Sequence, residues 1–172
     1  MREVQNKDEL ACLLQTSFPR GLSGVIGIDG KDGVGKTCLA NSIQKQIGGT
    51  VISLDPFVAK NYSTFIPHLN KADLKTALDV KGRPLIVEGI CLLAALAAVS
   101  TKPDLLIYVK LVLKWYWLDE DVCDSEEEVN ALIQRLSPVT PLTPRKQEII
   151  RYHCEYRPSS RADITYLQPI SQ

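Results

Sequence analysis

The pattern GxxxxGK[ST] is met at every fixed position by the stretch Gly30-Lys31-Asp32-Gly33-Val34-Gly35-Lys36-Thr37. The spacing has a physical reason, because the glycines let backbone N–H groups turn inward around an anion. A helix that begins near Gly35 would point its positive end at the same anion. Lys36 would reach the β- and γ-phosphates of a nucleotide, and the Thr37 hydroxyl would ligate Mg²⁺. The stretch therefore predicts a phosphate-binding loop.

The residues on either side of this loop support the prediction. The apolar run at 25–28 is typical of a buried strand, and residues 36–47 have the pattern of an amphipathic helix that ends at Gly48 and Gly49. A P-loop lies in this setting, between a strand and a helix. The alternative, a glycine-rich turn that binds no nucleotide, would not require these neighbours. We therefore expect residues 30–37 to bind the phosphates of a nucleotide.

The rest of the chain alternates between short apolar strands and helices. Further strands are predicted at 51–54, 84–87, 105–109 and 162–167. Further helices are predicted at 6–16, 71–78, 91–99, 126–136 and 145–156. This alternation indicates an α/β protein with a parallel sheet of about five strands flanked by helices, the three-layer P-loop NTPase fold. Ligands of such sheets bind outside the carboxyl ends of the strands, so functional residues should follow strands directly.

Length, charge and hydropathy exclude several classes of protein. The 172 residues suit a single domain, which we assign to residues 1–172. The 20 basic and 20 acidic side chains cancel, so the excess of positive charge typical of nucleic-acid binders is missing. The longest apolar run, at 90–99, is too short for a bilayer, which needs roughly 20 residues. The five cysteines are dispersed without a CxxC pair, as expected of free thiols. We expect a cytoplasmic protein with neither a nucleic-acid nor a membrane partner; its oligomeric state stays open.

Two acidic residues follow predicted strands and are candidates for the chemistry. Asp55 ends the strand at 51–54, where it could orient an acceptor hydroxyl and take its proton. Its alternative role is that of a turn residue before Pro56. Glu88 ends the strand at 84–87, where an acid can hold Mg²⁺ directly or through water. Its alternative role is that of a carboxylate at the start of a helix.

Two short patterns suggest a GTPase, but their arrangement argues against it. The segment 70–73 reads NKxD and the segment 79–82 reads DxxG. A GTPase has DxxG before NKxD, and its NKxD follows a buried apolar strand, whereas Pro67-His68-Leu69 precedes this one. We therefore expect Asn70 to cap a helix whose first turn holds Asp73.

Five segments together resemble one known family. In chain order they are IGIDGKDGVGKT, VISLDPF, LIVEGI, PDLLIYV and RPSSRADITY, and with their spacing over about 25–166 they resemble the uridine kinase family of P-loop kinases. The resemblance implies transfer of the γ-phosphate of ATP to a hydroxyl of a small molecule, with ATP and Mg²⁺ as cofactors. It implies that Asp55 is the catalytic base and that Glu88 is the acid of the metal site. It also implies that the late segment lies near the adenine, with these residues: Arg157, Pro158, Arg161 and Ala162.

The sequence departs from this family in the acceptor region and in the lid. Val58 stands where these kinases usually have a tyrosine, and the acceptor-binding insertion is abbreviated between residues 60 and 81. The lid-like segment, roughly 114–145, lacks the RRxxRD-like pattern that would supply cations to the transferred phosphoryl group. Four residues are candidates for that cation: Lys114, Arg135, Arg145 and Arg151. The cluster at 115–117 is expected to pack rather than to stack on a ligand. His68 and His153 are expected to be surface or partly buried residues.

The leading hypothesis is therefore a small-molecule kinase. Its acceptor would be a nucleoside, a nucleoside-like vitamin precursor or a sugar, and a pantothenate-like compound is a closer rival within the same class. The departing lid motivates the alternative, a P-loop nucleotide-binding regulatory or assembly protein without kinase activity.

Overall fold

A computed structural model describes residues 2–17, 24–59, 62–79, 84–114, 116–139 and 141–170. The strands are β1 (Arg2–Val4), β2 (Val25–Asp29), β3 (Thr50–Ser53), β4 (Leu85–Glu88), β5 (Leu105–Leu113), β6 (Tyr116–Trp117) and β7 (Ile164–Pro169). The longer helices are α1 (Lys7–Ser17), α2 (Lys36–Ile47), α3 (Lys71–Leu78), α6 (Val129–Leu136) and α7 (Pro144–Tyr156). The shorter ones are α4 (Leu92–Ala97), α5 (Glu120–Cys123) and α8 (Pro158–Arg161), with the 3₁₀ turns η1 (Asp55–Phe57) and η2 (Ile66–His68).

The strands form one sheet in the order β1-β7-β5-β2-β4-β3. All neighbours in this order are parallel, and β6 pairs with β5 in the antiparallel sense. The five predicted strands are all present, which confirms the α/β fold. The short strands β1 and β6 were not predicted, and they extend the sheet to seven strands. In the register of the centre, Ile28 and Ser53 both lie opposite Glu88, so β2, β3 and β4 end at the same edge.

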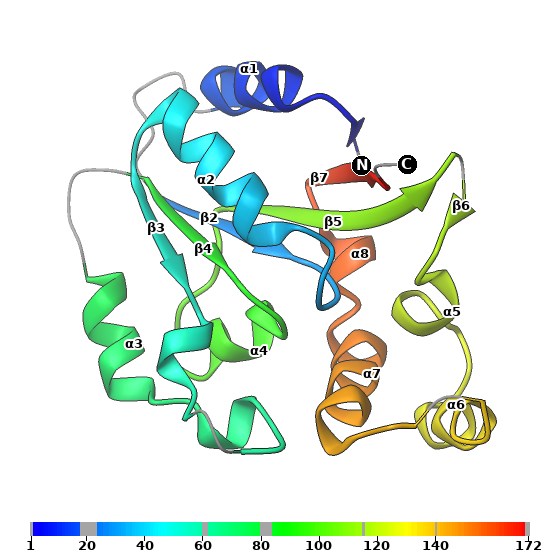
Figure 1. Ribbon diagram of the computed structural model, residues 1–172. Helices are drawn as coiled ribbons and strands as arrows, with labels where there is room; N and C mark the ends of the chain where they lie inside the picture. Colours follow the sequence, from blue (N-terminus) through cyan, green and yellow to red (C-terminus); the bar gives the residue numbers. More distant parts are fainter. Residues whose placement is uncertain are drawn as a thin grey trace.

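Helices cover both faces of the sheet (Figure 1). One face packs against α1 and α2 through a core that includes Leu14 and Leu39. The other face packs against α3, α4 and α7 through a core that includes Leu74, Leu92 and Ile149. In β4 the side chains alternate between the two cores, as expected of a strand buried on both sides. The predicted three-layer arrangement is therefore present.

The ends of two helices agree with the sequence prediction. Helix α2 runs from Lys36 to Ile47, and Gly48 follows with a φ of 76°. A positive φ is accessible to glycine, which explains why the helix ends there. The side chain of Asn70 accepts a hydrogen bond from the Asp73 amide at 3.2 Å and so caps α3. The NKxD stretch thus has the capping geometry expected in place of a guanine-binding one.

Other predictions need correction. The helix predicted at 126–136 begins only at Val129, because the Glu128 side chain caps it by accepting hydrogen bonds from the Asn130 and Ala131 amides. His153, expected to be a surface or partly buried residue, is fully buried, and its ring is hydrogen bonded to the Tyr108 hydroxyl and the Ile149 carbonyl.

Two further expectations concern the packing of the aromatic residues at 115–117 and whether any helix could span a membrane. Trp117 is buried and packs edge-on against Tyr108, as expected, whereas Trp115 lies outside the described residues. Tyr116, by contrast, is exposed. Within the described part of the chain, every helix is too short or too polar to cross a membrane.

Candidate functional site

The stretch of residues 30–37, called the glycine loop below, follows β2 and runs into the first turn of α2. Gly30, Gly33 and Gly35 have φ values of 147°, 78° and 91°, which residues other than glycine rarely adopt. At Gly30 there is also no room, because a Cβ atom would lie 2.7 Å from the Val109 carbonyl oxygen. The glycines of the motif are therefore required by the backbone path of the loop.

Lys36 begins α2 and turns its ammonium group back over the glycine loop. Its Nζ atom donates hydrogen bonds to the carbonyl oxygens of Gly30, at 2.9 Å, and Lys31, at 2.7 Å. Burial lowers the pKa of this ammonium, while the nearby acids Asp29 and Glu88 raise it. The positive charge is thus balanced by carboxylates from two neighbouring strands, and it lies beside the α2 N-terminus, where an anion is favoured.

Thr37 and Glu88 bring two oxygen donors together at the end of β4. The Thr37 hydroxyl donates a hydrogen bond to Glu88 Oε1 at 3.1 Å, and Glu88 is only 3% exposed. Hydroxyl and carboxylate oxygens suit Mg²⁺, which usually takes one or two protein ligands together with phosphate oxygens and water. In the described residues, no group of three or more His, Cys, Asp or Glu side chains could form a metal cage. The residues present therefore fit a metal ion that is bound mainly through a nucleotide.

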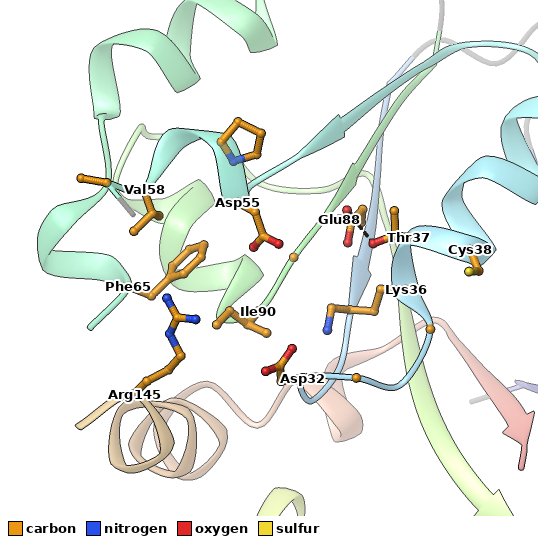
Figure 2. A pocket seen from close by; sticks show the side chains of 15 residues that line it. Asp32, Lys36, Thr37, Cys38, Asp55, Val58, Phe65, Glu88, Ile90 and Arg145 are labelled. Carbon is orange, nitrogen blue, oxygen red and sulfur yellow. Dashed lines mark hydrogen bonds between the residues drawn. The ribbon is translucent and has the colours of Figure 1, made fainter. Parts of the chain in front are cut away.

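A cavity of about 780 Å³ opens in front of these residues (Figure 2). One side is formed by the glycine loop and the start of α2, and the opposite side by η1, the chain after it, and the N-terminal end of α7. The lining residues are Asp32, Gly33, Gly35, Lys36, Thr37, Cys38, Asp55, Pro56, Val58, Ala59, Phe65, Glu88, Gly89, Ile90 and Arg145. The Asp55 carboxylate points into the cavity from η1, opposite Lys36. We call these two sides the phosphate side and the acceptor side, after the groups that we propose each to bind.

The acceptor side is held together by contacts with α7. Val58 pairs with Leu69 in an isolated antiparallel bridge, so the chain after η1 folds back on itself. The Glu148 carboxylate accepts hydrogen bonds from the backbone amides of Phe65 and Ile66, the latter at 2.9 Å. Phe65 is fully buried, yet it borders the cavity. One carboxylate of α7 therefore fastens the wall that faces the glycine loop.

The structure brings together most of the site residues predicted from the sequence, but not all. Asp55 and Glu88 line the same cavity as Lys36 and Thr37. Two members of the glycine loop face elsewhere: Lys31 forms an ion pair with Asp119, and Val34 is buried in the core. Arg157 and Arg161, predicted near the adenine, lie at the two ends of α8 and are not among the residues that line the cavity.

The four candidate lid cations differ in whether they line the cavity. Arg145 lines the cavity, and its guanidinium group points toward Phe65 and the space below Asp55 (Figure 2). Arg135 pairs with Glu127 at 2.9 Å, and Arg151 donates a hydrogen bond to Asn130 at 3.2 Å. Lys114 is exposed after the end of β5. Arg145 is thus the candidate that reaches the site.

Sequence reasoning missed Asp29, the last residue of β2. Its side chain is fully buried; one oxygen accepts a hydrogen bond from the Gly30 amide at 2.7 Å, and the other accepts one from the Tyr152 hydroxyl. Burial raises the pKa of Asp29 to about 6, against the lowering effect of these hydrogen bonds and of Lys36. An acid that ends an apolar strand is the signal that singled out Glu88, and it applies equally to Asp29. Nothing local in the sequence points to Tyr152.

Comparisons with known proteins agree with this geometry at the level of the fold. No protein-family profile and no curated protein sequence matches the chain. Among solved structures, a possible uridine kinase from Bacillus stearothermophilus is similar, with a TM-score of 0.56 and 17% sequence identity. The similarity covers 93% of this chain and 98% of that one. The protein is therefore an α/β protein with a P-loop kinase-like fold.

Proposed function

We propose that the protein is an ATP- and Mg²⁺-dependent phosphotransferase that moves the γ-phosphate of ATP to a hydroxyl group of a small metabolite. One observation carries the proposal. A single cavity is lined on one side by Lys36, Thr37 and Glu88 and on the other side by Asp55. A phosphoryl transfer needs this combination, because the donor phosphates and the acceptor hydroxyl must meet in line.

The phosphate side would bind the nucleotide. The amides of the glycine loop and the Lys36 ammonium would hold the phosphates, and Thr37 and Glu88 would hold Mg²⁺. When bound, the metal ion would neutralise charge on the β- and γ-phosphate oxygens. The proposal that Arg157 and Arg161 lie near the adenine rests on the family resemblance alone.

On the acceptor side, Asp55 would orient the hydroxyl group of the acceptor and take its proton. The acceptor oxygen forms a new bond to the γ-phosphorus, and the bond from that phosphorus to the bridging oxygen of ADP breaks. The proton of the hydroxyl moves to the Asp55 carboxylate, and ADP leaves with the electrons of the broken bond. Asp55 is exposed to the cavity, so it is accessible to an acceptor before the reaction.

Arg145 would supply the positive charge for the transferred phosphoryl group, which the lid-like segment lacks the usual pattern to provide. It lines the cavity from the first turn of α7, where the other three candidates do not reach. A guanidinium group at this place can bind two oxygens of the transferred phosphoryl group at once. The acceptor remains one of three classes, a nucleoside, a nucleoside-like vitamin precursor or a sugar. A cytoplasmic location remains a proposal that rests on the short apolar runs and the dispersed cysteines of the chain. A small-molecule partner is a proposal that rests on the family resemblance.

The substitution Asp55→Asn tests the assignment. The acceptor is first found by screening nucleosides, vitamins and sugars for thermal stabilisation in the presence of an unreactive ATP analogue. Loss of a general base should lower the rate of transfer by about 10²- to 10⁴-fold. Binding of the ATP analogue should stay nearly unchanged, because Asp55 lies on the acceptor side.

The control is Asp121→Asn, which changes an exposed acid of α5 away from the cavity. Full turnover by Asp55→Asn would remove Asp55 from the mechanism. ATP hydrolysis or binding that no acceptor in the panel stimulates would favour the alternative of a nucleotide-binding regulatory protein.

A further inference from the structure

Tyr152 joins α7 to the strand that leads into the glycine loop. It is buried, and its hydroxyl group donates a hydrogen bond to Asp29 Oδ2 while accepting one from the Leu93 amide at 3.1 Å. The other oxygen of the Asp29 carboxylate accepts from the Gly30 amide. A short chain of hydrogen bonds thus runs from α7 through two side chains to the first N–H group of the glycine loop.

We propose that Tyr152 is a positioning residue for the glycine loop, acting through Asp29; the inference rests on the proposed ATP-binding function of that loop. Tyr152 does not line the cavity of the site and would not touch the nucleotide. Its hydroxyl group fixes the Asp29 carboxylate, and the carboxylate in turn fixes the start of the loop.

The start of the loop is where a small displacement has the largest effect. The Gly30 backbone lies close against Val109, and its carbonyl oxygen is one of two that accept from the Lys36 ammonium. A shift of Gly30 would therefore move the group that is proposed to bind the phosphates. The position of Gly30 in turn depends on where the Asp29 carboxylate lies, because that carboxylate accepts the hydrogen bond of the Gly30 amide.

The hydroxyl group of Tyr152 can be separated from the packing of its ring. The ring stacks on Tyr156 with centroids 5.2 Å apart and packs edge-on against His153. A phenylalanine would keep these contacts, so α7 would retain its packing. It would leave one Asp29 oxygen and the Leu93 amide without their partner, and an unmade hydrogen bond to a buried charged group is costly.

The residues of α7 that contact the acceptor side lie on the same helical face as Tyr152. Arg145, Glu148 and Tyr152 are spaced by three and four residues, which places them on neighbouring turns of one helical face. One helix thus carries the contact to the acceptor wall and the contact to the glycine loop. Because the helix is continuous and packed against the core, the two contacts can be removed one at a time.

The experiment compares Tyr152→Phe with Tyr156→Phe. Tyr156 belongs to the same helix, and its hydroxyl group makes no hydrogen bond within the described part of the chain. Affinity for the unreactive ATP analogue is measured by calorimetric titration, and KM for ATP and for the acceptor are measured separately. We expect Tyr152→Phe to bind the analogue roughly tenfold more weakly, which is the effect of one hydrogen bond to a charged group. The KM for the acceptor should stay unchanged, and Tyr156→Phe should match the wild type.

A second variant covers the case in which Tyr152→Phe does not fold. Asp29→Asn keeps the shape of the side chain, but its single carbonyl oxygen can accept from only one of the two donors, Gly30 and Tyr152. It should weaken analogue binding as well, and Tyr152→Phe should add less in this background than in the wild type.

Three results would overturn the inference: equal ATP affinity in Tyr152→Phe and the wild type, an equal rise in both KM values, or additive effects of the two substitutions. Failure of the wild type itself to bind the ATP analogue would instead refute the proposed function.

Discussion

The two sides of the cavity are built in different ways. The phosphate side comes from one continuous stretch, residues 29–37, together with Glu88 from the neighbouring strand. Three of its charged groups, Asp29, Lys36 and Glu88, are buried, whereas Asp32 is exposed. The acceptor side is assembled from η1, the chain around Phe65, and α7, and its charged groups Asp55 and Arg145 are exposed.

This difference indicates which side of the cavity can vary in sequence, and so change the preferred acceptor, without loss of stability. Buried charges must keep their partners, because an unpaired one in the interior costs several kcal/mol. The phosphate side therefore tolerates little variation. Exposed charges on separate segments can be exchanged with less effect on stability, so the acceptor side is free to differ from that of the uridine kinase family. Val58, although it is buried, and the abbreviated segment 60–81 are departures from that family on the acceptor side.

Among the substitutions that should affect one side of the cavity and not the other, Arg145→Ala should have the largest effect. Loss of the proposed cation from the acceptor side should lower kcat by about 10³-fold, as the removal of a residue that stabilises transition-state charge does. Binding of the unreactive ATP analogue should change little, because the glycine loop is intact. Steady-state kinetics with the identified acceptor, beside calorimetric titration, measure both. Arg151→Ala, on the same helix but outside the cavity, is the control. An equal loss in both variants would remove Arg145 from the site.

Two buried titratable groups, Asp29 at the end of β2 and His153 on α7, predict a pH dependence of stability. Burial raises the pKa of Asp29 from 3.8 to about 6, so between these pH values the folded chain holds a proton that the unfolded chain has released. This contribution to the free energy of unfolding is lost as the pH rises, by about 3 kcal/mol. Burial lowers the pKa of His153 from 6.5 to about 4, so its contribution increases over a similar range, by about 3 kcal/mol. In the wild type the two effects oppose each other.

The substitution Asp29→Asn removes one of these two opposing contributions. Between pH 4 and pH 6 the free energy of unfolding of the variant should rise by about 2 kcal/mol relative to that of the wild type, because the variant lacks the Asp29 contribution that falls over this range. Urea unfolding at a series of pH values, without nucleotide, measures this difference. Asp121→Asn serves as the exposed control. Parallel curves for Asp29→Asn and the wild type would contradict the role assigned to burial at Asp29.

The smallest effect is expected for Glu148→Gln on the acceptor side. A glutamine has one carbonyl oxygen for the two amides of Phe65 and Ile66, so the wall around Phe65 is held less firmly. We expect the KM for the acceptor to rise about tenfold with ATP affinity unchanged, which is the opposite of the pattern expected for Tyr152→Phe. Glu155→Gln, an exposed acid on the same helix, should leave both constants unchanged. A comparable rise in the KM for ATP as well would show that the two sides are not separable.

The sequence predicted the fold well where the signals are local. The strands and helices around the glycine loop were found because apolar runs, glycines and caps act within a few residues, as Gly48 and Asn70 illustrate. The helix predicted at 126–136 was too long, since a glutamate as capping residue is an uncommon signal. The short strands β1 and β6 carry no pattern of their own and form because a partner strand is present.

The candidate site was predicted in part for the same reason. Asp55 and Glu88 follow apolar strands, and the shared edge of a parallel sheet brings such residues together. The choice of Arg145 among four cations depended on how α7 packs, and so did the contacts of Glu148 and Tyr152. Hydrogen bonds between residues about 80 or more positions apart leave no trace in one sequence.

The sequence by itself determined the phosphate-binding pattern, because the glycines, Lys36 and Thr37 act through backbone geometry over eight consecutive residues. It also determined that strands and helices alternate, because hydrophobic periodicity is a local property. Only the tertiary structure decided which cation faces the cavity, what fastens the acceptor wall, and that the acid beneath the glycine loop is held from α7. These features depend on side chains that meet only after the helices have packed on the sheet.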